Sequence, residues 1–224
     1  MRQAMRYKST ADYTTAEIRH LILSGELPAG APIDQIELAK RLDVSRHPVR
    51  QAIERLSERG FIHLNPHRSA VVADISANDM EELYSARRVV EHWAVLAAWP
   101  HYTAETRRQI RDLERQLRGI DPTQDLDDYM DANRSFHLAM YEPCRNRYIL
   151  RNIVSLFDLS ERYQRTALLH QARIKRSTQD HAEMVEAIER GDCNQLIALL
   201  TAHNAGTQAT VLDNLHDAPV AASR

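Results

Sequence analysis

The stretch IELAKRLDVSRHPVRQAIERLSERGFIHLNPHRSAVV, residues 36–72, contains two runs of helical spacing separated by a short break. Apolar residues recur at helical intervals on both sides of Asp43-Val44, which interrupts the period. Ser45 lies where the N-cap of the second helix belongs, and Gly60 lies where a C′ residue would end it. The pattern predicts two helices joined by a tight turn.

The second of these helices is predicted to carry an apolar stripe on one face and polar residues on the other. The polar face holds Arg46, His47, Arg50, Gln51 and Glu54. Arg46 and Arg50 are four residues apart, so they project from one face on successive turns. Arginine at the start of a helix that enters the major groove can bond guanine O6 and N7. The alternative is a solvated charged face in which Arg50 pairs with Glu54.

Two short β-like runs follow, at 61–64 and 70–72, and a turn-forming segment with a basic tip joins them. The tip contains His67 and Arg68. The sequence of helix, tight turn, helix and basic hairpin is the outline of a winged helix-turn-helix. We therefore predict a DNA-binding domain over residues 1–75.

The same residues resemble a known family. The run LILSGELPAGAPIDQIELAKRLDVSRHPVRQAIERLSERGFI resembles the DNA-binding signature of GntR-type bacterial transcription regulators. The resemblance implies that Arg46 and Arg50 read bases, that Ser45 and His47 lie at the DNA backbone, and that the wing meets the minor groove. The candidate DNA-binding residues are Ser45, Arg46, His47, Arg50, Gln51, His67 and Arg68. The chain departs from the family at His47 (usually Thr), Asp43 (usually Gly) and Ser69 (usually Gly).

Composition favours a mostly helical protein, because the 224 residues include only six Gly and eight Pro. Two cysteines form no disulfide framework, no apolar run reaches transmembrane length, and the N-terminus lacks a signal-peptide core. We therefore expect a cytoplasmic protein with no membrane partner. Residues 1–75 hold eleven Lys/Arg and nine Asp/Glu, whereas the remainder holds 18 and 22. This mild asymmetry has the sign expected of an N-terminal domain that binds DNA.

The chain from Asp79 onward has helical periodicity throughout, after a predicted linker at 72–78. The fold class is therefore predicted as mainly α, with a winged helix-turn-helix followed by an antiparallel six-helix bundle over 79–215. The predicted helices cover 79–98, 104–118, 125–141, 146–164, 172–190 and 193–213.

Three of the eleven histidines lie at informative places on these helices. His137 follows Asn133 by four residues, so both side chains leave one face. His181 lies in the fifth bundle helix, and His203 lies in the middle of the sixth. Three imidazoles and an amide oxygen could hold Zn, Ni, Cu or Fe(II). The alternative for each histidine is a hydrogen-bonded structural residue or a surface residue.

The bundle also resembles a known domain. The runs ELYSARRVVEHWAVLAA, DxNRSFHLAMYE and DHAEMVEAIERGD, together with the later His203, resemble the FCD effector domain of the FadR subfamily. The resemblance implies a metal bound by an Asp and three His at the floor of a small-ligand pocket. The Asp position falls on Asn133, and a family arginine falls on Arg87, for which a helix pair with Glu91 is the alternative.

The asparagine has a physical consequence, since four neutral ligands leave the +2 charge of a metal uncompensated. Relative to a site with an aspartate ligand, the affinity for the metal should fall and the attraction of the bound metal for an anion should rise. We therefore expect a metabolite-responsive regulator that binds a palindromic operator as a homodimer and takes a small carboxylic acid, with zinc, nickel or a similar divalent ion as cofactor. One alternative is a regulator in which the metal is itself the signal. A helical metalloenzyme is disfavoured, because no HExxH or placed general base is present.

Overall fold

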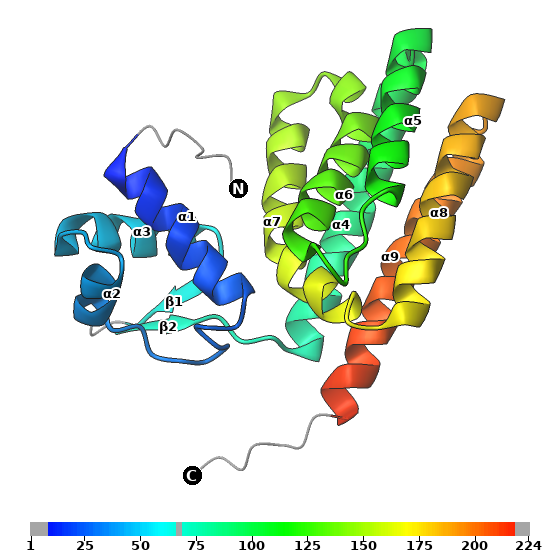
Figure 1. The fold of residues 1–224 in the computed structure, drawn as a ribbon. Coiled ribbons are helices and arrows are strands. Elements are labelled where there is room, and N and C mark those ends of the chain that lie inside the picture. Colours follow the sequence, from blue (N-terminus) through cyan, green and yellow to red (C-terminus); the bar gives the residue numbers. More distant parts are fainter. Residues whose placement is uncertain (1–8, 66–68, 218–224) are drawn as a thin grey trace. The chain divides into compact units, whose positions relative to one another are not determined.

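The computed structural model describes residues 9–65 and 69–217 of the 224-residue chain. It divides into two compact units with the boundary between Ile75 and Ser76 (Figure 1). None of the helices in the described part of the chain combines the length and apolarity needed to cross a membrane.

The first unit contains three helices and a two-stranded sheet within its described residues. The helices are α1 (Thr10–Leu23), α2 (Gln35–Arg41) and α3 (Arg46–Glu58), and the strands are β1 (Ile62–Leu64) and β2 (Ala70–Val72). Helix α3 packs against both α1 and α2. The small core that they share with the sheet includes Ile18, Leu21, Leu38, Val49, Ala52, Ile53, Leu56, Phe61, Ile62 and Val72. The winged helix-turn-helix is thereby confirmed.

Local backbone chemistry fixes the turn and the end of α3. Asp43 has a positive φ of 52°, the left-handed conformation that Asp reaches more readily than most residues. Gly60 has a φ of 75° and donates its N–H to the Ser57 carbonyl, while the next residue donates to Leu56. This is a Schellman ending, which requires the left-handed conformation that glycine adopts without strain.

The wing is an antiparallel pair in which Ile62 lies opposite Val72. The segment before α2 joins this sheet through a bridge between Pro32 and Val71. The predicted tip residues His67 and Arg68 lie outside the described residues.

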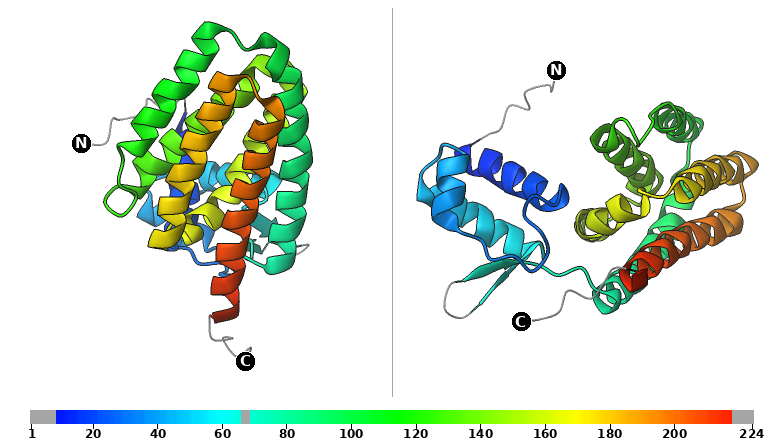
Figure 2. Two further views of the ribbon diagram at one scale, coloured as in Figure 1. Left: turned by 90° about the vertical axis from the view of Figure 1, so that its right-hand side faces the viewer. Right: turned by 60° about the horizontal axis from the view of Figure 1, so that its bottom comes forward.

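The second unit is the six-helix bundle that the sequence predicted. Its helices are α4 (Ala77–Ala98), α5 (Ala104–Arg118), α6 (Leu126–Tyr141), α7 (Arg147–Ala167), α8 (Gln171–Arg190) and α9 (Cys193–Asp217), with short 3-10 turns η1 (Trp99–His101) and η2 (Glu142–Cys144). Figure 2 shows that α8 and α9 run side by side, and α4 packs against α7 and α9. Ser76, Thr103, Asp125 and Asn146 cap α4, α5, α6 and α7 through their side chains, which explains why these helices begin where they do.

The interior of the bundle is apolar over most of its volume but contains a concentration of buried polar side chains. The apolar part includes Ile110, Phe136, Met140, Ile153, Phe157, Met184 and Leu196. The buried polar residues include Arg87, Glu91, Asn133, His137, Ser160, Arg173, Ser177, Asp180, His181, His203 and Asn204. Buried polar groups are costly unless they are paired or serve a ligand. This polar interior is therefore the first place to look for a binding site.

Candidate functional site

The exposed face of α3 carries the residues that the sequence predicted to meet DNA. Ser45, Arg46, His47 and Arg50 are exposed, and Gln51 is half-buried. The opposite face holds the buried Pro48, Val49, Ala52, Ile53 and Leu56 and anchors the helix in the core. The helix therefore presents its basic face to solvent as a rigid unit.

Arg50 lies near Glu54, but the two are loosely associated. The Arg50 Nε and Glu54 Oε1 atoms are 3.9 Å apart, and both side chains are more than half exposed. Exposed pairs of this kind contribute little, so Arg50 remains able to bind another partner.

The N-terminus of α3 lies beside these basic residues. Ser45 occupies the N-cap position, but its side chain makes no capping hydrogen bond. The first amides of a helix have no partner within the helix and attract anions. The start of α3 thus offers unpaired amides, a serine hydroxyl and two arginines on one surface, which suits a phosphate backbone.

In the bundle, the three predicted histidines come together from three helices. His137 on α6, His181 on α8 and His203 on α9 are all buried, and one ring nitrogen of each lies within 4.8 Å of the others. The ring centroids are 4.8 to 5.3 Å apart. Asn133, one turn before His137, is also buried.

The electrostatic state of these imidazoles suits metal ligation. Burial holds the pKa of His137 and of His181 well below the ordinary histidine value, and neighbouring cationic groups add to the effect. Burial also lowers the pKa of His203, although Asp180 opposes it. His137 Nδ1 and His181 Nε2 are buried without a hydrogen-bond partner among the described residues. Neutral imidazoles with an unpaired ring nitrogen are the form in which histidine binds a metal.

His203 belongs to a second network built around Arg173 of α8. The Nδ1 atom of His203 lies 3.0 Å from Asp180 Oδ2, which leaves Nε2 as the nitrogen that can face the other histidines. Arg173 donates to the His203 carbonyl (2.9 Å), to Thr207 Oγ1 (3.0 Å) and to Asp180 Oδ2 (3.3 Å). Burial alone would raise the pKa of Asp180, but its contacts with His203 and Arg173 outweigh burial and lower it. Asp180 therefore acts as a carboxylate that orients a candidate ligand histidine.

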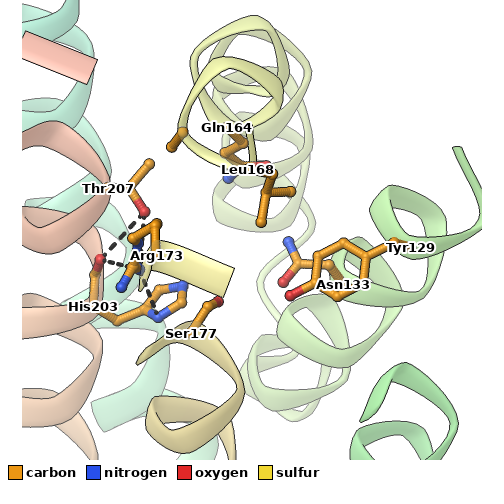
Figure 3. Close-up of a pocket in the computed structure, with 9 residues that line it drawn as sticks. Tyr129, Asn133, Gln164, Leu168, Arg173, Ser177, His203 and Thr207 are labelled. Carbon is orange, nitrogen blue, oxygen red and sulfur yellow. Dashed lines mark hydrogen bonds between the residues drawn. The ribbon is translucent and has the colours of Figure 1, made fainter. Parts of the chain in front are cut away.

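A pocket opens beside this network. About 20 Å³ of it has room for water-sized groups, and its empty space, about 300 Å³ in all, includes open solvent. Figure 3 shows Tyr129 and Asn133 of α6 on one side and Arg173, His203 and Thr207 on the other. The full lining is Tyr129, Asn133, Gln164, Ala167, Leu168, Arg173, Ser177, His203 and Thr207.

Arg87, the arginine that the family resemblance associated with a ligand, does not line this pocket. Its Nε donates to Glu91 Oε1 at 2.6 Å, and both side chains are almost fully buried. Glu91 also accepts hydrogen bonds from Tyr141 (2.9 Å) and Asn204 (3.1 Å). In this structure Arg87 therefore adopts the helix-pair arrangement that was the alternative in the sequence analysis.

Two known domain families match the chain. Residues 10–72 match the bacterial regulatory proteins of the gntR family, and residues 82–206 match the FCD domain. The chain belongs to the GntR family and carries an FCD domain. It is a DNA-binding transcription regulator of the GntR/FCD type and not an enzyme, since the family and the relatives are regulators.

Relatives support this assignment along most of the chain. The uncharacterised HTH-type transcriptional regulator BphR of Paraburkholderia xenovorans is 26% identical over 204 residues, which is 88% of this chain and 82% of BphR. The HTH-type transcriptional repressor RspR of Escherichia coli is 23% identical over 186 residues, covering 83% of this chain and 82% of RspR. The solved structure of McbR/YncC of E. coli has a TM-score of 0.78 at 19% identity, covering 93% of this chain and 100% of that structure, and shares its fold.

FCD domains often bind a metal ion, and the residues of this GntR-family regulator fit one. The fit rests on three buried ring nitrogens within 4.8 Å and on the unpartnered nitrogens of His137 and His181. The grouped ring nitrogens belong to His137, His181 and His203, and no carboxylate is among them.

Sequence reasoning missed Arg173, Asp180, Ser177 and Tyr129. A signal for Arg173, Ser177 and Asp180 was present in the sequence. Arg173 and Ser177 precede the predicted His181 by eight and four residues, which places them on the same face of α8, and Asp180 is its immediate neighbour. Tyr129 precedes Asn133 by four residues on α6 and could have been found in the same way.

Proposed function

We propose that this regulator binds a palindromic operator as a homodimer and responds to a small carboxylate effector held beside a divalent metal ion in the FCD domain. The observation that carries the proposal is the buried cluster of His137, His181 and His203 beside a pocket with a buried arginine in its wall. A site of this kind combines metal ligands with a cationic group, which is the chemistry that binds a small acid.

In the DNA-binding half, the N-terminal turn of α3 enters the major groove. Arg46 and Arg50 bond base edges, while Ser45 and His47 contact phosphates, with Gln51 beside them. The wing residues His67 and Arg68, which lie outside the described part, meet the minor groove. The exposure of the four residues at the start of α3 supports this arrangement.

The dimer is proposed from an apolar stripe on α4. Val89, Trp93 and Leu96 are 70%, 45% and 49% exposed, and their spacing places them on one face of the helix. Contiguous exposed apolar surface of this kind is typical of an interface. A second copy of the chain is the proposed occupant, because one recognition helix reads too few base pairs for genomic specificity.

The metal is held by His137, His181 and His203, with Asn133 as a weak fourth ligand or as a hydrogen-bonding neighbour of the site. Zinc or nickel suits three imidazoles. When bound, the ion supplies a positive charge and open coordination positions to an anionic oxygen. Because the protein ligands carry no negative charge, more of that charge acts on the effector than at a site with an aspartate ligand. We also propose that the regulator is a repressor, as its relative RspR is named.

The experiment that tests this function is a thermal-shift screen of small carboxylic acids, with zinc and after chelation, followed by fluorescence anisotropy on operator DNA. We expect an acid to raise the melting temperature only when metal is present, and the same acid to change operator affinity. If metal alone changes operator affinity and no acid does, the metal is itself the signal. If neither changes operator affinity, the sensing function is wrong.

A further inference from the structure

Ile36 is a large apolar side chain that the first unit leaves in solvent. It is 58% exposed, whereas Ile33, Leu38 and Ala39 around it belong to the core of that unit. It lies in the first turn of α2, two residues before the buried Leu38, so the two side chains leave opposite sides of the helix. Isoleucine also favours a helix less than alanine, lysine or glutamate does. Neither packing nor helix propensity therefore accounts for this residue.

The first turn of α2 lies close to the start of α3, which carries the candidate DNA contacts. Helices α2 and α3 pack against each other. Asp34 caps α2, and its Oδ1 atom accepts hydrogen bonds from the backbone N–H groups of Glu37 (3.1 Å) and Ile36 (2.7 Å). These two N–H groups lower the pKa of Asp34, and the nearby charge of Arg46 adds to their effect. Ile36 is therefore exposed in the same neighbourhood as an arginine that is proposed to read bases.

The chemistry around Ile36 suits a base edge better than a phosphate. Its neighbours Asp34 and Glu37 are exposed acids, which repel the charged DNA backbone. The first helix of a helix-turn-helix ordinarily crosses that backbone. The base edges in the major groove are uncharged, and the apolar group that they offer is the methyl group of thymine. An aliphatic side chain beside Arg46 can bury that methyl group while the arginine bonds a guanine.

We infer that Ile36 contacts the methyl group of a thymine in each operator half-site, so that α2 adds to the base specificity of α3. The inference rests on the proposed placement of α3 in the major groove and adds a specificity-determining residue to it. The contact is apolar and needs no hydrogen bond. Burial of one methyl-sized group corresponds to about a fourfold change in affinity, which sets the size of the expected effect.

The test measures binding of the full chain to duplexes in which one thymine is replaced by deoxyuridine, which lacks the methyl group but keeps the base-pairing edge. The operator is first selected from randomised duplexes by the wild-type chain, and affinities are measured by fluorescence anisotropy. The variants are Ile36→Ala, which removes the contact, and Ile36→Val, which keeps most of it. Leu169→Ala is the matched control, because Leu169 is a 76% exposed aliphatic residue of the second unit.

We expect one thymine of a half-site at which the wild type binds the deoxyuridine duplex about fourfold more weakly. Ile36→Ala should bind the thymine duplex at least about fourfold more weakly than the wild type and should not distinguish thymine from deoxyuridine there. Ile36→Val should keep the discrimination, and Leu169→Ala should bind as the wild type does. Ile36→Ala should not lower the melting temperature, because the side chain is exposed and alanine favours a helix more than isoleucine does.

The outcomes separate this inference from the function on which it rests. If Arg46→Ala and Arg50→Ala bind the selected operator as the wild type does, the placement of α3 is wrong and the inference falls with it. If those variants lose base preference but discrimination at no thymine depends on residue 36, the placement of α3 stands and the role of Ile36 is overturned. Equal losses by Ile36→Ala on the thymine and deoxyuridine duplexes also overturn it, because they indicate a contact with sugar or backbone.

Discussion

Replacement of Arg87 by methionine should destabilise the bundle strongly, because it leaves Glu91 as a buried unpaired charge. Arg87 is 1% exposed and Glu91 is 3% exposed, so solvent cannot replace the lost partner. Removing one member of a buried ion pair costs about 3–5 kcal/mol. Glu91 keeps hydrogen bonds from Tyr141 and Asn204, so we expect the lower end of that range, about 3 kcal/mol.

The assay is urea unfolding followed by tryptophan fluorescence. Both tryptophans of the chain, Trp93 and Trp99, lie in the second unit, so the signal reports on the bundle and not on the winged helix. The double variant Arg87→Met/Glu91→Gln is the matched control. It removes the unpaired charge but keeps an oxygen that accepts from Tyr141 and Asn204, so it should be more stable than Arg87→Met alone. An Arg87→Met variant within about 1 kcal/mol of wild type, with no gain in the double variant, would refute this reasoning and leave Arg87 available to bind an effector.

Three further predictions concern the metal, the DNA face and the dimer. Asn133→Asp should tighten zinc binding and weaken acid binding in calorimetry, since the new carboxylate neutralises part of the metal charge; unchanged affinities would remove this residue from the site. Arg46→Ala or Arg50→Ala should cost about 1–3 kcal/mol of operator-binding free energy and relax base preference at one operator position. Arg68→Ala should instead weaken binding evenly across operator sequences and flatten the salt dependence of binding. Fluorescence anisotropy on mutated operators can distinguish the two effects. Trp93→Glu should convert a dimer to a monomer in sedimentation velocity, and a variant that remains dimeric would move the interface away from α4.

Features that depend on neighbouring residues could be predicted from the sequence. The left-handed Asp43 and the Schellman ending at Gly60 follow from local backbone preferences, and these two positions delimit the recognition helix. The bundle helices were predicted to within a few residues for the same reason, since their capping residues and apolar periods lie within one segment. The largest difference is at the end of α9, which extends to Asp217 where the prediction ended at residue 213.

Features that depend on distant residues could not be read in the same way. The sequence left Arg87 with two alternatives, because the partners that complete its network, Tyr141 and Asn204, follow Glu91 by 50 and 113 residues. The hydrogen bonds of Arg173 to His203 and Thr207 join two helices, and no periodicity within either helix reveals them. The convergence of His137, His181 and His203 was a hypothesis from family resemblance, and their proximity in the structure supplies the geometry that the hypothesis required.

The most direct test of the central claim is whether metal binding and acid binding support each other. The measurement is calorimetric titration of the carboxylic acid found in the thermal-shift screen into the full chain, with zinc present and after chelation, and of zinc with and without that acid. Reciprocity requires that each ligand raise the affinity of the other by the same factor, and we expect that factor to be about 5- to 150-fold. Equal acid affinity with metal and after chelation would contradict the account and leave His137, His181 and His203 as structural residues of the bundle.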